Sequence, residues 1–162
     1  MIGNDIIDLK LAKKESNWKR KGFLDKIFSL QEQSLIQEDI NPELMVWNLW
    51  SRKEAAYKIY NRMTGISGYF PWRINCCFNN IHSGAVIIGE TVFYTKTQIT
   101  DDYIYTIAVC EMDYFNKIET LNTIENIKKN NGIPYFSDVF SRKSYPVSIT
   151  HHGRFHKIII LK

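Results

Sequence analysis

The sequence predicts an α+β fold, with an antiparallel sheet and helices packed on one side of it. Three observations support this class: a strand-like segment opens the chain, helical patterns occupy residues 23–63, and strand-like segments make up most of the remainder. Grouping of helices between strands is typical of α+β proteins. At 162 residues the chain is long enough for one core, so we expect a single domain over residues 1–162.

The first third of the chain supplies the first strand and two short helices. Residues 2–9 have β-branched Ile6 and Ile7 at their centre, which favours a strand. Apolar residues at helical spacing over 23–28 predict a short helix. The sequence SLQE at residues 29–32 has the pattern of a capping box and predicts the start of another helix.

A long helix is predicted from Pro42, with Asn41 as its N-cap, to about Met63. Its apolar residues recur at helical spacing, at Val46, Leu49, Trp50, Tyr57 and Tyr60. Continuing this stripe predicts apolar residues at two positions where the chain has Lys53 and Glu54. The stripe is therefore interrupted by charge.

Lys58 follows Glu54 by four residues, so the two side chains share one face of the helix. One interpretation is a solvated ion pair, worth about 0.2–0.5 kcal/mol to the helix. The other is a functional site, since local rules tend to be broken at such sites. A second acidic segment at the start of the chain favours the functional interpretation.

The second half of the chain is predicted to consist mainly of strands. Strand-like segments occur at 73–78, 85–88, 91–97, 103–109, 147–150 and 155–161. Ser83-Gly84, Asp101-Asp102 and Gly153 mark turns. Residues 116–129 are predicted to form a surface helix that ends at Asn130-Asn131-Gly132.

Composition indicates a globular chain with a mildly basic surface. No run approaches the ~20 apolar residues of a membrane span, and the N-terminus lacks the pattern of a signal peptide, so we expect a cytoplasmic protein. The net charge is +4, and basic residues cluster early, at Lys10, Lys13, Lys14, Lys19, Arg20 and Lys21. This cluster is either a solvated surface or a docking face for nucleic acid, a phosphorylated ligand or an acidic protein.

Asp5 is an acidic residue in an apolar strand, a costly placement unless it is paired or bound to a metal ion. Asp8 would face the opposite side of the strand, and we interpret it as a capping or surface acid. A second carboxylate ligand must then come from elsewhere, and Glu54 is the candidate. Two carboxylates suit a hard ion such as Mg²⁺, which takes one or two carboxylates with waters and phosphates.

A third polar segment, PVSITHHGRF at residues 146–155, places two histidines and an arginine at a strand–turn–strand junction. Three interpretations fit these residues. They are a metal site, a phosphate site formed by histidine, Arg154 and a hydroxyl group, or an ordinary turn.

Together the three segments resemble the signatures of the 4′-phosphopantetheinyl transferases. GNDIID at residues 3–8 resembles G-x-D-x-x-[DE], WSRKEAAYK at 50–58 resembles [FW]-x-x-K-E-A-x-x-K, and VSITHHG at 147–153 resembles S-[LI]-S-H. Their order and the chain length are similar to the short, holo-acyl-carrier-protein-synthase branch. The resemblance covers the termini and residues 20–68 well and is vague over 80–140.

This resemblance implies the phosphopantetheinyl transferase fold, one lobe per chain, in a homotrimer with sites between subunits. It implies transfer of 4′-phosphopantetheine from coenzyme A to a serine of an apo acyl (or peptidyl) carrier protein, as in fatty acid biosynthesis, with release of 3′,5′-ADP. Asp5 and Glu54 would hold Mg²⁺, with Mn²⁺ as an alternative. Glu54 would take the serine proton, directly or through a metal-bound water, and Lys58 would contact the phosphates and help the leaving group.

The resemblance also implies the binding residues. Lys53 and Lys58 would bind coenzyme A, and Thr150 and His151 would hold its adenosine phosphate end, with His151 serving a neighbouring subunit's site. The basic N-terminal third, including Arg20-Lys21, would dock the acidic carrier protein.

Some residues depart from the family pattern, and one rival interpretation stays open. Asn4 replaces Ile or Val, and Thr150 replaces Ser with its hydroxyl kept. Ile7 stands where the two-lobed branch has a metal-binding acid, which favours a water as a further ligand. The rival is a non-catalytic basic module that binds a nucleotide or nucleic acid. The chain has no basic–aromatic RNA motif and no helix-turn-helix pattern, so we expect neither nucleic acid nor membrane as a partner.

Overall fold

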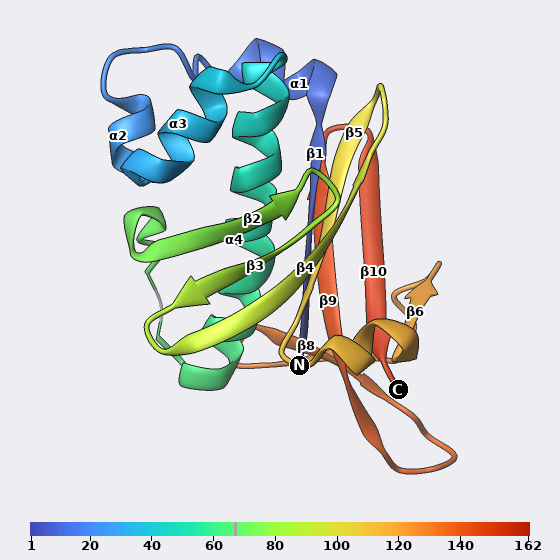
Figure 1. Cartoon of the computed structure of the whole chain (residues 1–162). Coiled ribbons are helices and arrows are strands. Elements are labelled where there is room, and N and C mark those ends of the chain that lie inside the picture. Colours follow the sequence, from blue (N-terminus) through green and yellow to red (C-terminus); the bar gives the residue numbers. More distant parts are fainter. Residues whose placement is uncertain (67) are drawn as a thin grey trace.

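The structure, a computed structural model, describes residues 1–66 and 68–162 and contains two antiparallel sheets (Figure 1). Across the first sheet the strands are β1 (Ile2–Asp8), β5 (Tyr103–Val109), β4 (Thr91–Ile99), β3 (Ser83–Ile88) and β2 (Ile74–Asn80). Across the second they are β6 (Ile118–Leu121), β10 (Phe155–Leu161), β9 (Ser144–His152), β8 (Ile133–Ser137) and β7 (Ile127–Asn130). The α+β class is therefore confirmed, with two sheets where the sequence suggested one.

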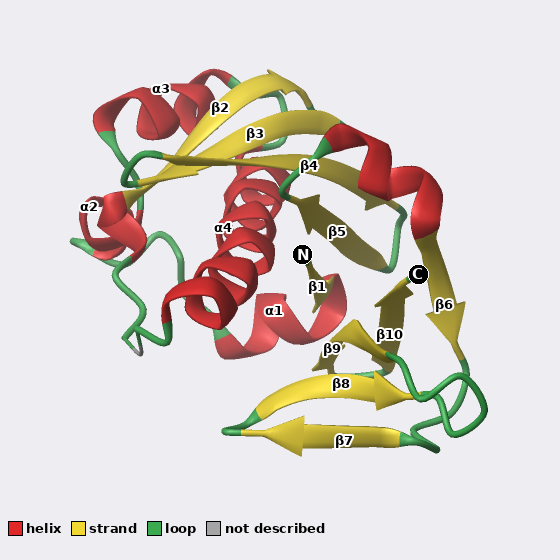
Figure 2. Cartoon of the chain, turned by 90° about the horizontal axis from the view of Figure 1, so that it is seen from below, coloured by secondary structure: helices red, strands yellow, loops and turns green. Residues whose placement is uncertain are grey.

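The helices lie between β1 and β2 in the sequence. They are α1 (Leu9–Glu15), α2 (Phe23–Ile27), α3 (Leu30–Glu38) and α4 (Pro42–Thr64), and two 3-10 turns follow, η1 (Pro71–Arg73) and η2 (Met112–Lys117). Figure 2 shows α4 lying against the first sheet, with α2 and α3 near one end of that sheet. No helix in the described part of the chain combines the length and the apolar character needed to cross a membrane.

α4 packs directly on β1, and this contact depends on Gly3. A Cβ atom at Gly3 would overlap with the carbonyl oxygen of Ala55. Ala55 and Ile59 are fully buried at this contact. Because Gly3 has no side chain and that of Ala55 is small, the strand and the helix can approach closely. The glycine of the first signature therefore brings β1 against the helix that carries the second.

The predicted capping box is confirmed at the start of α3. The backbone N–H of Ser29 donates to Oε2 of Glu32 at 2.8 Å, and the N–H of Glu32 donates to Oγ of Ser29 at 3.3 Å. Asn41 caps α4, as predicted, by accepting a hydrogen bond from the N–H of Leu44.

The predicted surface helix over residues 116–129 is wrong. Residues 118–121 form β6, which pairs with the end of β10, and residues 127–130 form β7. Asn131 and Gly132 have positive φ angles of 48° and 80° and form the turn between β7 and β8. Two successive residues with positive φ angles are typical of a tight β-hairpin turn. The segment that we interpreted as a helix stop therefore connects two strands.

The two sheets meet where β9 lies beside β1 (Figure 1). Alternate backbone N–H groups of β1 donate to side chains of β9. The bonds run from Asn4 to Oγ of Ser148 at 3.0 Å, from Ile6 to Oγ1 of Thr150 at 3.2 Å, and from Asp8 to Nδ1 of His152 at 2.8 Å. Because strand side chains alternate in direction, three side chains of one face of β9 line up along the edge of β1.

Candidate active site

The site begins where α4 faces β1. Glu54 and Lys58 lie one turn apart on α4, as their spacing predicts. The Lys58 ammonium is 3.5 Å from Oδ1 of Asp5 and donates to the backbone carbonyl of Asn4 at 2.6 Å. The first two signature segments therefore meet through Lys58 and Asp5.

The third segment reaches the same carboxylate through Thr150. Its hydroxyl group accepts the hydrogen bond from the N–H of Ile6 and donates to Oδ1 of Asp5 at 3.3 Å. Thr150 is buried, so this hydroxyl is a fixed part of the site. All three segments, although far apart in the sequence, thus converge on Asp5.

Burial destabilises the ionised form of both carboxylates. Burial raises the pKa of Asp5, and Lys58 opposes this effect. Burial raises the pKa of Glu54 to about 7, and the nearby charge of Asp5 adds to the shift. Like charges in a desolvated site produce such shifts, and pKa values shifted in this way are common at functional sites.

Asp5 and Glu54 fit a divalent cation on chemical grounds. They are hard oxygen donors, and a cation would offset the burial and the repulsion that together raise the pKa of Glu54. The described residues contain no group of three His, Cys, Asp or Glu side chains with the geometry of a metal site. A two-carboxylate set suits Mg²⁺, which commonly completes its coordination with waters and substrate phosphates.

A cleft of about 280 Å³ opens at these carboxylates. Its lining includes Asp5, Glu54, His151, His152, Trp47 and Trp50. His151 is exposed, whereas Thr150 next to it is turned toward β1. A larger cavity, of about 480 Å³, is lined by Tyr57, Phe70 and Arg73. Both border α4, the cleft at Trp47, Trp50 and Glu54 and the larger cavity at Tyr57.

Lys53 does not lie at the cleft. Its side chain is fully buried, and its ammonium group donates to Oε2 of Glu32 at 2.7 Å and to the carbonyls of Ile27 and Pro71. Lys53 thus joins α4 to α2, α3 and η1. This placement does not fit the predicted contact with coenzyme A, because every donor of the ammonium group already has an acceptor inside the protein.

Asp8 caps α1, in agreement with our interpretation of it as a capping acid. Its Oδ1 accepts from the backbone N–H groups of Lys10 and Leu11, and its carboxylate pairs with the Arg154 guanidinium at 2.8 Å. The hydrogen bonds from Arg154 hold the pKa of Asp8 well below its usual range. Arg154 therefore stabilises the junction of β1 and α1 through Asp8. Helix α1 itself was not predicted from the sequence.

Two contributions to the site were missed in the sequence. Ser148 and His152 extend the hydrogen bonding of Thr150 along β1, and their spacing of two residues in a strand was a signal for this shared face. Tyr69 packs between the rings of Trp50 and Tyr57. Nothing in the local pattern around Tyr69 indicates that contact.

Comparison with known proteins agrees with this fold. The sequence model of the 4′-phosphopantetheinyl transferase superfamily matches residues 1–108. Because this match covers more than half of the chain, the chain belongs to the 4′-phosphopantetheinyl transferase superfamily. No curated protein matches the sequence at a significant level.

Two solved structures share the fold. The first is Helicobacter pylori holo-[acyl-carrier-protein] synthase in complex with coenzyme A, with a TM-score of 0.54 and 15% identity over 68% of this chain and 100% of that chain. The second is apo-ACPS of Chronobacterium ammoiniagenes, with a TM-score of 0.54 and 14% identity over 67% of this chain and 93% of that chain. About a third of the present chain thus has no counterpart in either structure.

Proposed function

We propose that this protein transfers the 4′-phosphopantetheine group from coenzyme A to a serine hydroxyl of an apo acyl or peptidyl carrier protein. Family membership supports a phosphopantetheinyl transferase activity in general. The observation that carries the specific proposal is the convergence of all three signatures on Asp5, with Glu54 and Lys58 beside it. Two carboxylates in the cleft would repel the phosphates of nucleic acid, which does not favour a nucleic-acid-binding module.

In the proposed reaction the serine oxygen attacks the phosphorus atom that carries pantetheine. A bond forms between this oxygen and phosphorus, and the bond to the bridging oxygen breaks. The bridging oxygen keeps the electron pair and leaves with 3′,5′-ADP. The serine proton is taken up by a base, so charge and atoms balance.

Glu54 is the base in this proposal. In the cation-free cleft its pKa of about 7 lies near neutral pH, where a base combines a useful ionised fraction with sufficient proton affinity. If its carboxylate holds the cation, Glu54 would take the proton through a water instead. Lys58 places a positive charge beside Asp5 and can stabilise the negative charge that develops on the phosphate oxygens. Thr150 and the carbonyl of Asn4 hold Asp5 and Lys58 in position.

Asp5 and Glu54 would hold Mg²⁺, or Mn²⁺ in its place. When bound, such an ion supplies charge neutralisation to phosphate oxygens. Mass action then gives a direct check, because an ion that binds only the folded protein raises its melting temperature. We expect Mg²⁺ to raise the melting temperature of the wild type and to have little effect on Asp5→Asn.

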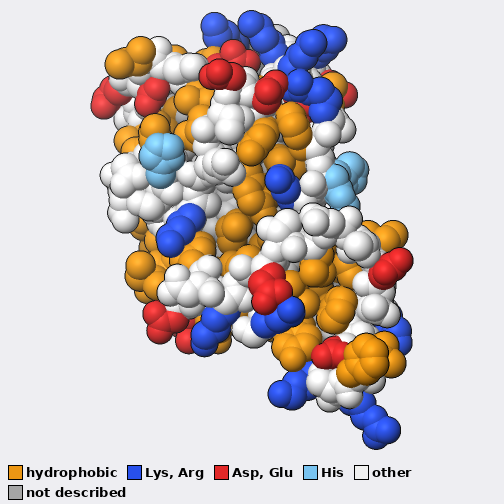
Figure 3. All heavy atoms as spheres, turned by 90° about the vertical axis from the view of Figure 1, so that its right-hand side faces the viewer, with side chains coloured by type: hydrophobic (Ala, Val, Ile, Leu, Met, Phe, Trp, Pro, Cys, Tyr) orange, Lys and Arg blue, Asp and Glu red, His pale blue; other side chains and the backbone are white. Residues whose placement is uncertain are grey.

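The carrier protein would dock on the basic surface around α1. Lysine and arginine side chains gather over this end of the molecule in Figure 3, and the basic residues of positions 10–21 are all exposed. An acidic carrier would be steered toward this surface, and the encounter rate would fall with added salt. Arg20 and Lys21 are the candidates that we would substitute first.

The remaining parts of the proposal concern assembly and the adenosine end of coenzyme A. We propose a cytoplasmic homotrimer with sites between subunits. The exposed His151 fits this arrangement, since it can meet a ligand or a neighbouring subunit. Size-exclusion chromatography with light scattering would test the trimer, since a monomer mass at micromolar concentration would contradict it.

Intact-protein mass spectrometry tests the activity. An apo carrier protein is incubated with the protein, coenzyme A and Mg²⁺, and a gain of one phosphopantetheine is the expected result. Glu54→Gln serves as the inactive comparison, and Glu90→Gln, at an exposed turn, serves as the matched control. The proposal is contradicted if the wild type modifies none of several fatty-acid, polyketide and peptide carriers and does not bind coenzyme A.

A further inference from the structure

Tyr69 lies directly over the catalytic face of α4. Its ring centroid is 5.9 Å from that of Trp50 and 5.0 Å from that of Tyr57, both in edge-on geometry. Positions 50, 54 and 57 are spaced by four and three residues, so they share one helix face with Glu54 in the middle. A ring that touches both flanking residues therefore covers Glu54.

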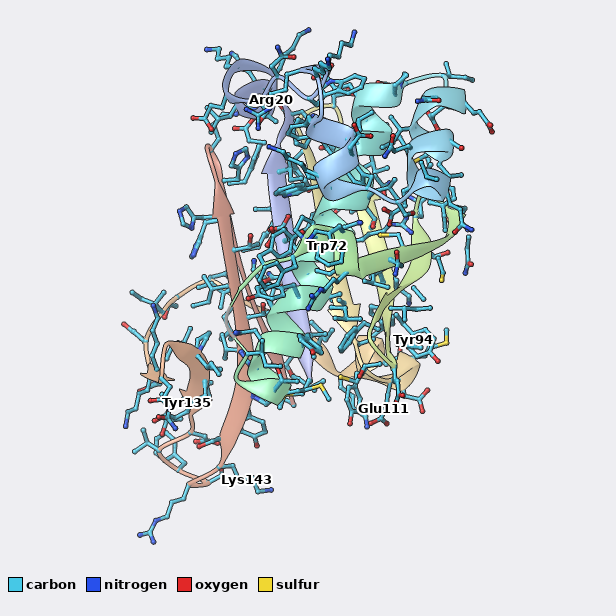
Figure 4. All side chains as sticks on the ribbon, turned by 90° about the vertical axis from the view of Figure 1, so that its left-hand side faces the viewer. Arg20, Trp72, Tyr94, Glu111, Tyr135 and Lys143 are labelled. Carbon is cyan, nitrogen blue, oxygen red and sulfur yellow. The ribbon has the colours of Figure 1, made fainter. Side chains whose placement is uncertain are left out.

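This position is fixed by more than ring packing. The hydroxyl group of Tyr57 accepts a hydrogen bond from the backbone N–H of Gly68, the residue before Tyr69. The segment then continues to Pro71, whose carbonyl group accepts a hydrogen bond from Lys53 of α4 at 3.0 Å, and to Trp72, which Figure 4 labels. Tyr69 is thus held against the helix by its neighbour in the sequence and by two aromatic side chains.

The hydroxyl group of Tyr69 is buried but has no hydrogen-bond partner among the described residues. Buried tyrosine hydroxyl groups usually have a partner, because leaving one unpaired is costly. Burial raises the pKa of Tyr69, and the charges of Glu54 and Asp5 and a side-chain interaction with the Glu54 carboxylate add to this effect. The hydroxyl therefore keeps its proton. The Glu54 carboxylate lies within reach of it as an acceptor, but no hydrogen bond of normal geometry joins Tyr69 to any described residue in the free protein.

We propose that Tyr69 is a further catalytic residue, whose hydroxyl group donates a hydrogen bond to a non-bridging oxygen of the phosphoryl group that is transferred. This inference rests on the proposed function. A phosphate oxygen is the acceptor that the substrate would bring to a cleft containing Asp5 and Glu54. A preorganised donor of this kind stabilises the charge that develops on the oxygen during transfer.

Tyr69→Phe tests the inference, because it removes the hydroxyl group and keeps the ring contacts. Since a hydrogen bond to a charged group is lost, kcat/KM for carrier modification should fall about 10- to 100-fold. Affinity for 3′,5′-ADP, which lacks the transferred phosphoryl group, should stay unchanged. The melting temperature should change little, since the hydroxyl makes no hydrogen bond of normal geometry to a described residue in the free protein. Tyr94→Phe, a matched removal of a hydroxyl on β4, should behave as the wild type.

A second measurement separates substrate contact from orientation of Glu54. In the Glu54→Gln background, Tyr69→Phe should still weaken binding of coenzyme A, measured by calorimetry without turnover. If it causes no further loss there, Tyr69 acts only through Glu54, and the inference is overturned. It is also overturned if Tyr69→Phe matches Tyr94→Phe in rate and affinity, or if it lowers 3′,5′-ADP affinity and melting temperature together.

The wild type separates this inference from the proposed function. A wild type that neither modifies a carrier nor binds coenzyme A removes the proposed function, and Tyr69 then has no phosphoryl group to contact. If the wild type is active and Tyr69→Phe is equally active, only the proposed role of Tyr69 is contradicted.

Discussion

Removing the charge of Glu54 should stabilise the folded protein while it abolishes the proposed activity. Glu54 is half-buried beside Asp5, and its pKa is raised from an ordinary 4.5 to about 7. A raised carboxylate pKa means that the folded state holds its proton more tightly than the unfolded state does. Stability relative to an uncharged side chain is therefore retained below pH 4.5 and lost as the pH rises through about 7.

The size of this loss follows from the two pKa values. A change from 4.5 to about 7 corresponds to about 3 kcal/mol at pH 8, at about 1.4 kcal/mol for each tenfold change in proton affinity. Solvent that reaches the half-buried carboxylate reduces this figure, and we expect about 2 kcal/mol. Glu54→Gln keeps the shape of the side chain and removes the charge, so it should recover this amount.

The assay is urea denaturation at pH 5 and pH 8, with a chelator present so that no divalent ion compensates the charge. Glu54→Gln should exceed the wild type by about 2 kcal/mol at pH 8 and by much less at pH 5. The control Glu90→Gln lies at an exposed turn and should show no such difference. An equal effect of Glu54→Gln at both pH values would refute the electrostatic reasoning.

Three further outcomes follow from individual contacts. Thr150→Val should cost about 1–3 kcal/mol of stability in urea denaturation, because the Ile6 N–H loses its acceptor, and Thr150→Ser should restore it. Lys53→Met should cost about 3–5 kcal/mol, because a buried carboxylate is left unpaired, yet calorimetry of the folded variant should find unchanged affinity for coenzyme A. Arg154→Gln should lower stability at pH 7, because Asp8 loses the hydrogen bonds from the guanidinium group. Because the pKa of Asp8 is lowered, this difference should shrink as the pH falls below 3.8, and a denaturation series that shows no such trend would contradict it.

Much of the site could be predicted because residue spacing within each signature determines which side chains share a face. Glu54 and Lys58 share a face through helical spacing alone, and Asp5 was marked as an acidic residue in an apolar strand. Their meeting depends on the packing of β1 against α4, which Gly3 permits. That contact is local to the first 58 residues and lies within the segment matched by the family.

The role of Lys53 could not be predicted in this way. The same motif that places Glu54 at the cleft places Lys53 one residue earlier, on the buried side of the helix. Its partner Glu32 was recognised only as part of a capping box, and it serves both purposes. A pair that joins two helices depends on how these helices pack, and periodicity within one helix does not contain that information.

The failed helix prediction has a similar cause. Apolar residues recur every third position at Ile118, Leu121, Ile124 and Ile127, which suits a helix as well as short strands. Residues 118–121 form a strand because they pair with the edge of β10, and residues 127–130 form one because the hairpin turn at Asn131 pairs them with β8. Short strands take their stability from partners elsewhere in the chain, so their own sequence decides little.

The side-chain hydrogen bonds from β9 to β1 also affect how the protein folds. Each bond joins residues separated by 144 positions, so β1, the first strand to be synthesised, cannot form these bonds until β9, near the end of the chain, has been made. Contacts of such sequence separation form slowly, because chain entropy is lost before they contribute energy. Asp5 therefore gains its Thr150 hydroxyl only when the C-terminal hairpin docks. Assembly of the acidic cleft and closure of the chain are then a single late event, and a nascent chain that lacks its last twenty or so residues holds the two carboxylates without the strand that orders them.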